Sequence, residues 1–173
     1  MKKDQKEALA VIPARGGSKS IPRKNVQRFA GKPLLAYSIE STRQSPSVNR
    51  VVVSTDDVEI ADVARDYGSE VIWRPAEISG DTASSESALL HALEHLSQTE
   101  KYEPYLIVFL QCTSPLTAPE DIEGTIRALI HEDADSALAV APFHHFLWKR
   151  DKTGSAMGIN HDKACRQLRQ ERN

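Results

Sequence analysis

The chain has 173 residues, of which 40% are hydrophobic and 27% are charged, and its formal net charge is −2. This length suits one domain with a well-formed core, and the slight negative charge argues against non-specific attraction to nucleic acids or anionic membranes. No apolar run approaches the roughly 20 residues of a membrane span, and the N-terminus lacks the apolar stretch of a secretory signal. The two cysteines, Cys112 and Cys165, show no metal-ligand spacing. We therefore expect a cytoplasmic protein that binds neither nucleic acid nor membrane.

Apolar, β-rich runs alternate with segments of helical periodicity along the chain. In chain order the pattern predicts strand 8–13, helix 34–44, strand 50–54, helix 58–67, strand 70–73, helix 84–96, strand 105–111, helix 119–131 and strand 136–141. Residues 51–53 and 106–110 are apolar on both faces, as in central parallel strands that helices cover on both sides. The predicted fold is therefore α/β, with a doubly wound and mostly parallel sheet.

A loop rich in glycines and cations follows the first predicted strand. Gly16 and Gly17 let the backbone turn sharply and bring N–H groups close to an anion. The cations that fall in this loop are Arg15, Lys19, Arg23 and Lys24. The loop matches neither the Walker A motif nor the G-x-G-x-x-G fingerprint, which disfavours ATPase and dinucleotide-binding functions. The residues favour a phosphate site for phosphoryl or nucleotidyl transfer, although a solvated basic loop is the alternative.

Three more polar segments follow predicted strands, at residues 54–57, 74–85 and 111–116. In open α/β sheets, ligands bind beyond the carboxyl ends of the strands, so we expect these segments to surround the same site as the loop. Asp56 and Thr117 each stand three residues before a glutamate, which is the spacing of a helix-capping box. Both are therefore predicted to start helices. Cys112 falls near the expected pocket, where we interpret it as a structural residue.

Five blocks, at residues 12–25, 52–57, 74–77, 81–85 and 110–116, together resemble the CMP-sialic acid synthetases, or acylneuraminate cytidylyltransferases. The resemblance covers roughly residues 8–150. It implies a Rossmann-like nucleotidyltransferase fold. It also implies transfer of CMP from CTP to a nonulosonic, sialic-type acid, with release of pyrophosphate and with Mg²⁺ as cofactor.

The resemblance also assigns roles to individual residues. Arg15 and Lys24 would be catalytic, because they would stabilise charge on the leaving group. Residues expected at the nucleotide are Ser18, Lys19, Asn25, Arg74, Asp81, Thr82, Ala83 and Ser85. For Asp81 and Thr82 the alternative is that they cap the helix starting near Ser84. Residues expected at the sugar acid are Gln111, Thr113, Ser114 and Arg169, where residues 113–115 are alternatively a simple turn.

By the same resemblance, residues 1–142 would form a nucleotide-binding α/β domain, and residues 143–173 an incomplete segment for dimerisation and for the sugar site. Family members continue beyond this point to the aspartates that bind Mg²⁺. We therefore expect a homodimer, a truncated C-terminus and metal ligands outside the chain. Alternative hypotheses are a cytidylyltransferase for legionaminic, pseudaminic or 3-deoxy-octulosonic acid, and a truncated CTP-binding module without catalysis.

Overall fold

The computed structural model describes residues 7–19, 21–141 and 147–160. The chain divides into two compact units, residues 1–138 and residues 139–173. The boundary expected from the sequence, after residue 142, lies slightly later. None of the helices in the described part of the chain has the length and apolar character needed to cross a bilayer.

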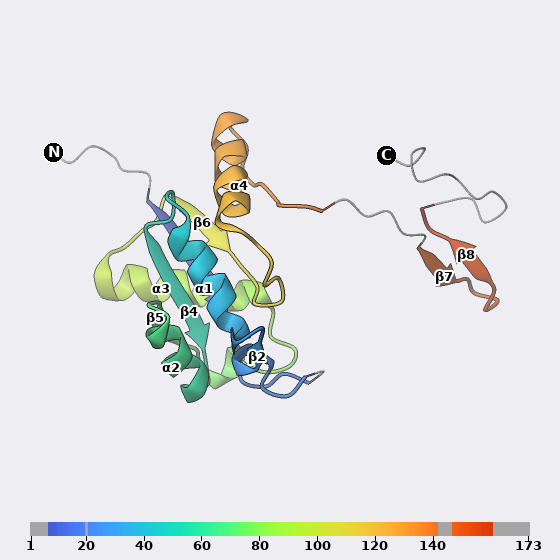
Figure 1. Cartoon of the computed structure of the whole chain (residues 1–173), viewed down its shortest axis with the longest axis horizontal. Helices are drawn as coiled ribbons and strands as arrows, with labels where there is room; N and C mark the ends of the chain where they lie inside the picture. Colours follow the sequence, from blue (N-terminus) through green and yellow to red (C-terminus); the bar gives the residue numbers. More distant parts are fainter. Residues whose placement is uncertain (1–6, 20, 142–146, 161–173) are drawn as a thin grey trace. The chain divides into compact units, whose positions relative to one another are not determined.

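A four-stranded parallel sheet forms the centre of the first unit (Figure 1). Its strands are β1 (Ala8–Pro13), β4 (Arg50–Thr55), β5 (Glu70–Trp73) and β6 (Leu106–Phe109). They are ordered β5-β4-β1-β6, and every neighbouring pair is parallel. The chain thus builds one side of the sheet outward from β1 and then returns to add β6 on the other side. The strand order reverses between β1 and β6.

Helices cover both faces of this sheet (Figure 1). The four helices are α1 (Leu34–Gln44), α2 (Val58–Asp66), α3 (Ser85–Glu100) and α4 (Pro119–His131). Apolar side chains of α1, α2 and α4 pack on one face, where Ile12 and Leu35 are fully buried. Leu96 of α3 packs against Leu9 and Val11 on the other face. The prediction of a doubly wound α/β fold is confirmed.

Several short elements complete the described chain. They are the 3-10 turns η1 (Lys24–Val26) and η2 (Ala76–Ile78), and the strands β2 (Arg28–Phe29), β3 (Lys32–Pro33), β7 (Trp148–Arg150) and β8 (Ala156–Gly158). Strands β2 and β3 form one antiparallel pair, and β7 and β8 form another in the second unit. The sequence pattern did not predict these pieces, because two or three residues are too few to show a period.

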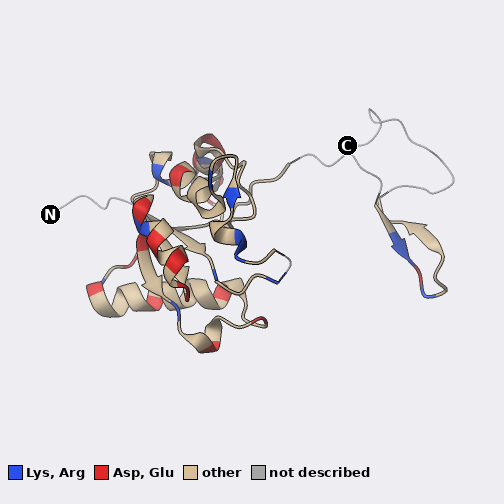
Figure 2. Cartoon of the chain, turned by 60° about the horizontal axis from the view of Figure 1, so that its bottom comes forward, with Lys and Arg blue, Asp and Glu red and all other residues tan. Residues whose placement is uncertain are grey.

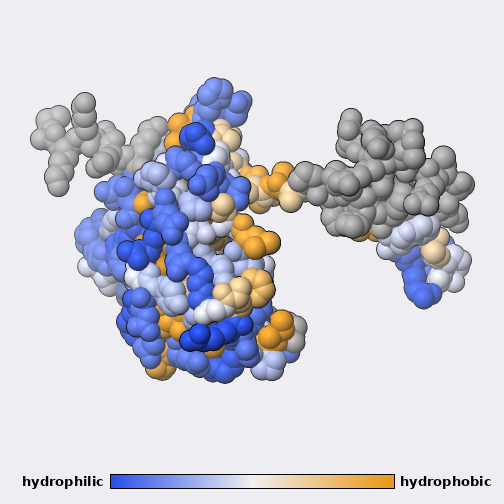
Figure 3. All heavy atoms as spheres, viewed as in Figure 1, coloured by the Kyte–Doolittle hydropathy of each residue, from blue (hydrophilic) through white to orange (hydrophobic). Residues whose placement is uncertain are grey.

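The predicted strand at residues 136–141 is wrong. These residues form no strand, and both Leu138 and Val140 are 83% exposed. Hydrophobic spheres accordingly lie on the surface just after α4 in Figure 3. The sequence alternates in the manner of a strand, but β-propensity acts mainly through packing against neighbouring strands. No described strand pairs with this segment, so the local preference is not realised.

The predicted starts of α2 and α4, at residues 58 and 119, are confirmed, but each capping residue lies one position later than the spacing indicated. Asp57, not Asp56, is the N-cap of α2, and its Oδ1 accepts a hydrogen bond from the Ile60 N–H at 3.1 Å. In α4 the N-cap is Ala118, whose N–H donates to Asp121 Oδ2 at 2.9 Å. The spacing rule located both helix starts but could not choose between adjacent capping residues.

Candidate functional site

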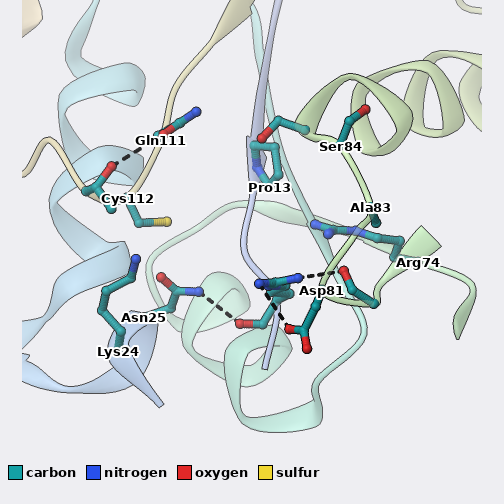
Figure 4. A pocket seen from close by; sticks show the side chains of 13 residues that line it. Pro13, Lys24, Asn25, Arg74, Asp81, Ala83, Ser84, Gln111 and Cys112 are labelled. Atoms are coloured by element: carbon teal, nitrogen blue, oxygen red, sulfur yellow. Dashed lines mark hydrogen bonds and ion pairs between the residues drawn. The ribbon is translucent and has the colours of Figure 1, made fainter. Parts of the chain in front are cut away.

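A pocket of about 250 Å³ opens beyond the carboxyl ends of β1 and β6, where the strand order reverses (Figure 4). This is the position where open α/β sheets bind their ligands. Its walls come from the loop after β1, from the segment between β5 and α3, and from the residues after β6. The lining residues are Pro13, Arg15, Lys24, Asn25, Arg74, Gly80, Asp81, Ala83, Ser84, Ser85, Gln111, Cys112 and Thr113.

The segment after β4 does not line the pocket but fixes the loop that does. The Gly16 N–H donates to Asp56 Oδ1 at 3.0 Å, and the Ala14 N–H donates to the Ser54 carbonyl at 3.0 Å. A Cβ atom on Gly16 would lie only 2.6 Å from Asp57 Oδ2. Gly16 is thus required for close approach to this segment. The anion nearest to its N–H group is a carboxylate of the protein itself.

Arg23 anchors the loop and does not face the pocket. Its guanidinium makes a two-pronged contact with Asp57, at 3.1 and 3.0 Å, and also pairs with Glu59. The hydrogen bond to Asp57 raises the pKa of Arg23. The backbone of Arg23 is left-handed, with φ of 55°, which is an uncommon conformation for a residue other than glycine. Of the four loop cations, Arg23 is thus paired with carboxylates of the protein and does not line the pocket.

Asn25 closes the loop at its other end. The side chain is 7% exposed, and Nδ2 donates to the Arg15 carbonyl at 3.0 Å across the base of the loop. This contact draws η1 toward the end of β1. Lys24, the neighbour of Asn25, lines the pocket together with Arg15.

Arg15 and Lys19 share one carboxylate. Lys19 Nζ lies 2.6 Å from Asp81 Oδ2, and Arg15 Nη2 lies 3.5 Å from Asp81 Oδ1. The hydrogen bond from Lys19 lowers the pKa of Asp81. Arg15 Nη1 also donates to the Gly80 carbonyl at 2.6 Å. These contacts join the loop to the segment before α3.

Arg74 and Lys24 are the pocket cations that lack a carboxylate partner within the described ranges. Arg74 is 9% exposed, and its guanidinium donates to Ser54 Oγ at 3.2 Å and to the Ser54 carbonyl. Burial lowers the pKa of Arg74. Its hydrogen-bond partners are neutral, although the charge of Asp56 acts on it electrostatically. A buried cation without an ion pair is unfavourable, so an anionic ligand in this pocket would offset the cost. Figure 2 shows basic and acidic residues interspersed over the first unit, so this positive charge is local.

The N-terminus of α3 forms another part of the wall. Ser84 is the N-cap, and its Oγ accepts from the Ser87 N–H at 3.1 Å. The alternative that Asp81 or Thr82 caps this helix is therefore wrong. Ala83 and Ser85 line the pocket at the positive end of a helix 16 residues long. Helix N-termini favour anions, so this wall adds to the effect of the cations.

The residues after β6 form the remaining wall. Gln111 and Thr113 line the pocket with exposed side chains, whereas Ser114 does not line it and donates its N–H to the Gln111 carbonyl at 3.2 Å. Cys112 is 4% exposed, and burial raises its pKa to about 12. Its thiol therefore stays protonated at neutral pH and serves packing rather than nucleophilic chemistry.

Most of the residues predicted for the site lie around this one pocket. They are Arg15, Lys24, Asn25, Arg74, Asp81, Ala83, Ser85, Gln111 and Thr113. The predicted residues that do not line it are Ser18, Lys19, Thr82 and Ser114, and Arg169 lies outside the described residues. The prediction missed Pro13, Gly80 and Ser84. Gly80 and Ser84 adjoin predicted residues and Pro13 lies two positions before Arg15, so proximity in the sequence was the available signal.

The described residues do not form a magnesium site by themselves. Among residues 7–19, 21–141 and 147–160, no group of three or more His, Cys, Asp or Glu side chains could hold a metal ion. Asp81 is the carboxylate that lines the pocket, and it is already paired with two cations. Mg²⁺ therefore stays a prediction from the resemblance, and no step below depends on it.

A doubly wound sheet with a cationic pocket at its switch point is typical of proteins that bind nucleotides and related phosphates. Residues 9–161 match the model of the cytidylyltransferase family, and the chain belongs to this family. It is 37% identical to N-acylneuraminate cytidylyltransferase A of Danio rerio, over 94% of this chain and 37% of that protein. It is 40% identical to pseudaminic acid cytidylyltransferase of Campylobacter jejuni, over 79% of this chain and 59% of that protein.

Solved structures agree with this assignment. CMP:2-keto-3-deoxy-manno-octonic acid synthetase, solved with CTP, matches with a TM-score of 0.62 and 27% identity, over 74% of this chain and 49% of that one. A 4-diphosphocytidyl-2C-methyl-D-erythritol synthase shares the fold, with a TM-score of 0.69 at 14% identity over 91% of this chain and 70% of that one. The resemblance to the CMP-sialic acid synthetases is thus confirmed at the level of family. The chain spans 37% and 59% of the two curated relatives named above.

Proposed function

We propose that this chain supplies the nucleotide-binding part of an enzyme that transfers CMP from CTP to a nonulosonic acid and releases pyrophosphate. The observation that carries the proposal is the pocket in which Lys24 and Arg74, without carboxylate partners among the described residues, face the N-terminus of α3. Such a site suits a highly charged anion such as a nucleoside triphosphate. Membership of the cytidylyltransferase family supports CTP as that anion.

In the proposed reaction, the hydroxyl oxygen of the sugar acid attacks the α-phosphorus of CTP. A new oxygen–phosphorus bond forms, the bond to the bridging oxygen of the β-phosphate breaks, and the hydroxyl proton passes to solvent. Arg15 and Lys24 would offset the charge that grows on the departing pyrophosphate. Removing one such contact typically costs on the order of 2–4 kcal/mol of transition-state stabilisation.

The two remaining walls suit the other parts of the substrates. Ala83 and Ser85 offer backbone groups and a hydroxyl beside Arg74, where the cytosine and ribose would lie. Gln111 and Thr113, after β6, would contact the sugar acid. The relatives are named for acylneuraminate and pseudaminic acid, so the proposal extends to this class of acid and not to one member.

The proposal includes a homodimer in the cytoplasm with Mg²⁺ as cofactor. These three points are supported by the likeness to the cytidylyltransferase family. The described residues do not themselves form a metal site. Ligands for Mg²⁺ would then come from the nucleotide phosphates and from residues outside the described ranges.

Thermal unfolding tests the nucleotide assignment. A ligand that binds only the folded state raises the melting temperature as its concentration exceeds its Kd. We expect millimolar Mg²⁺-CTP to raise the melting temperature more than Mg²⁺-ATP does. Equal shifts would contradict the assignment of the base.

Pyrophosphate release then tests catalysis. We expect release when CTP is combined with a nonulosonic acid, and a panel of sialic, legionaminic, pseudaminic and 3-deoxy-octulosonic acids identifies the preferred one. Binding of CTP without release for any of these acids would instead favour a non-catalytic module.

A further inference from the structure

The described contacts of Asp81 differ from those expected of a residue that reads the base or caps a helix. Its carboxylate pairs with Lys19 at 2.6 Å and with Arg15 at 3.5 Å. Ser84 caps α3, so the helix does not need Asp81. Within the described part of the chain, these two ion pairs are the polar contacts of the Asp81 side chain. The residue therefore acts on the loop cations.

The proposed function assigns Arg15 to the departing pyrophosphate, and the resemblance places Lys19 at the nucleotide as well. A carboxylate and a phosphate both present negatively charged oxygens, and both accept hydrogen bonds from guanidinium and ammonium groups. The two anions cannot use the same donors at once. The side chains of Asp81 and Lys19 are 51% and 76% exposed, so an incoming anion can reach the pair from solvent.

We propose that Asp81 is an internal counter-anion that pairs with Arg15 and Lys19 in the ligand-free protein. Nucleotide phosphates then bind by displacing the Asp81 carboxylate from these two cations. This inference rests on the proposed function only in taking a polyphosphate as the ligand. Asp81 thus governs the affinity of Arg15 and Lys19 for phosphate.

The displacement gives the site a preference among anions. A small anion such as inorganic phosphate gains few contacts beyond those that Asp81 gives up. A polyphosphate can replace Asp81 at Arg15 and Lys19 and also reach Lys24, which has no carboxylate partner among the described residues. Longer phosphate chains are therefore expected to compete with Asp81 more effectively than single phosphates.

Calorimetric titration with inorganic tripolyphosphate, which lacks a base, tests the displacement. Asp81→Asn removes the charge and keeps the shape of the side chain. We expect this variant to bind tripolyphosphate about two-fold to ten-fold more tightly than the wild type at low ionic strength, as loss of two exposed ion pairs implies. Asp81→Ser repeats the measurement if Asp81→Asn does not fold. Unchanged or weaker binding would overturn the proposal.

Glu77→Gln is the matched control. Glu77 is an exposed carboxylate in η2, only a few residues from Asp81, and it makes no ion pair or hydrogen bond among the described residues. Removing it changes the net charge equally, so we expect its effect on tripolyphosphate binding to stay under roughly two-fold. A gain as large as that of Asp81→Asn would mean that only net charge matters, which also overturns the proposal.

Titration with nucleotides separates this inference from the proposed function. If Asp81 reads cytosine instead, Asp81→Asn lowers the affinity for CTP and leaves the affinity for tripolyphosphate unchanged. The inference then fails. If CTP binds no better than ATP while Asp81→Asn still raises the affinity for tripolyphosphate, the cytidylyltransferase proposal fails. The role of Asp81 as a counter-anion then stands.

Discussion

The two halves of the loop after β1 carry similar charge but use it differently. In the first half, Arg15 and Lys19 pair with Asp81, whose side chain is 51% exposed. In the second half, Arg23 pairs with Asp57, whose side chain is 18% exposed and also caps α2. The Asp81 carboxylate is half-exposed and caps no helix, whereas the Asp57 carboxylate is mostly buried and fixes the start of α2. The partner of a cation thus determines whether the cation is available to a ligand.

Lys24 shows the difference most directly, because it adjoins Arg23 and has no carboxylate partner in the described ranges. We expect Lys24→Met to raise the Kd for CTP about ten-fold to a hundred-fold, the usual loss for a hydrogen bond to a charged group. The melting temperature of the ligand-free protein should hardly change, because the Lys24 side chain makes no ion pair or hydrogen bond with the residues that the structure describes. Calorimetric titration and thermal unfolding measure the two effects.

Arg23→Met is the comparator for Lys24→Met. It removes the anchor to Asp57, so the melting temperature should fall, and CTP affinity should change less than in Lys24→Met. Equal losses of CTP affinity in the two variants would show that both cations contact the nucleotide. The division of the loop into a ligand-binding cation and an anchor would then be wrong.

The adjacent glycines of the loop extend the comparison to packing. In Gly16→Ala the new Cβ would lie 2.6 Å from Asp57 Oδ2, while Gly17→Ala meets nothing within 4 Å. We expect Gly16→Ala to lower the free energy of unfolding by about 1–3 kcal/mol, the usual cost of overpacking. Gly17→Ala should stay within about 0.5 kcal/mol of the wild type. Urea denaturation distinguishes them, and similar values would contradict the close packing against Asp57.

Sequence reasoning predicted the layers of this fold because periodicity is a local property. The runs around Ile12, Val52 and Val108 are apolar enough to identify buried strands, and the rule for open sheets then located the pocket. The failed strand at residues 136–141 marks the limit of this reasoning. Its alternation is local, but a strand also needs a partner, and the sequence does not show whether one is present.

The roles of charged residues were harder to predict, because each depends on a partner distant in sequence. Arg23 and Lys24 are adjacent cations, and the sequence does not distinguish the one that anchors the loop from the one that faces a ligand. The pairing of Asp81 with Lys19 likewise joins two loops that meet only after β1 and β5 take their places in the sheet. The sequence identified the residues around the pocket but not the contacts among them.

The smallest expected effect concerns the cap of α2. Asp57→Ala removes the acceptor for the Ile60 N–H and the partner of Arg23. We expect the free energy of unfolding to fall by about 1 kcal/mol, the typical value for a lost N-cap. Asp62→Ala, in the same helix, removes an exposed ion pair with Arg65 and should cost less than about 0.5 kcal/mol. Equal losses would contradict the special role of Asp57.

The pH dependence of this difference tests whether the charge of Asp57 is responsible. Burial tends to raise the pKa of Asp57, but the Ile60 N–H and the Arg23 guanidinium outweigh it, so the pKa is lowered on folding. A lowered pKa stabilises the folded state above the unfolded pKa of about 4, and this stabilisation is lost as the pH falls through the folded value. The advantage of the wild type over Asp57→Ala should therefore be constant near neutral pH and shrink below about pH 4. An advantage that persists undiminished in acid would mean that the carboxylate charge, and with it the Arg23 pair, contributes nothing to holding this half of the loop.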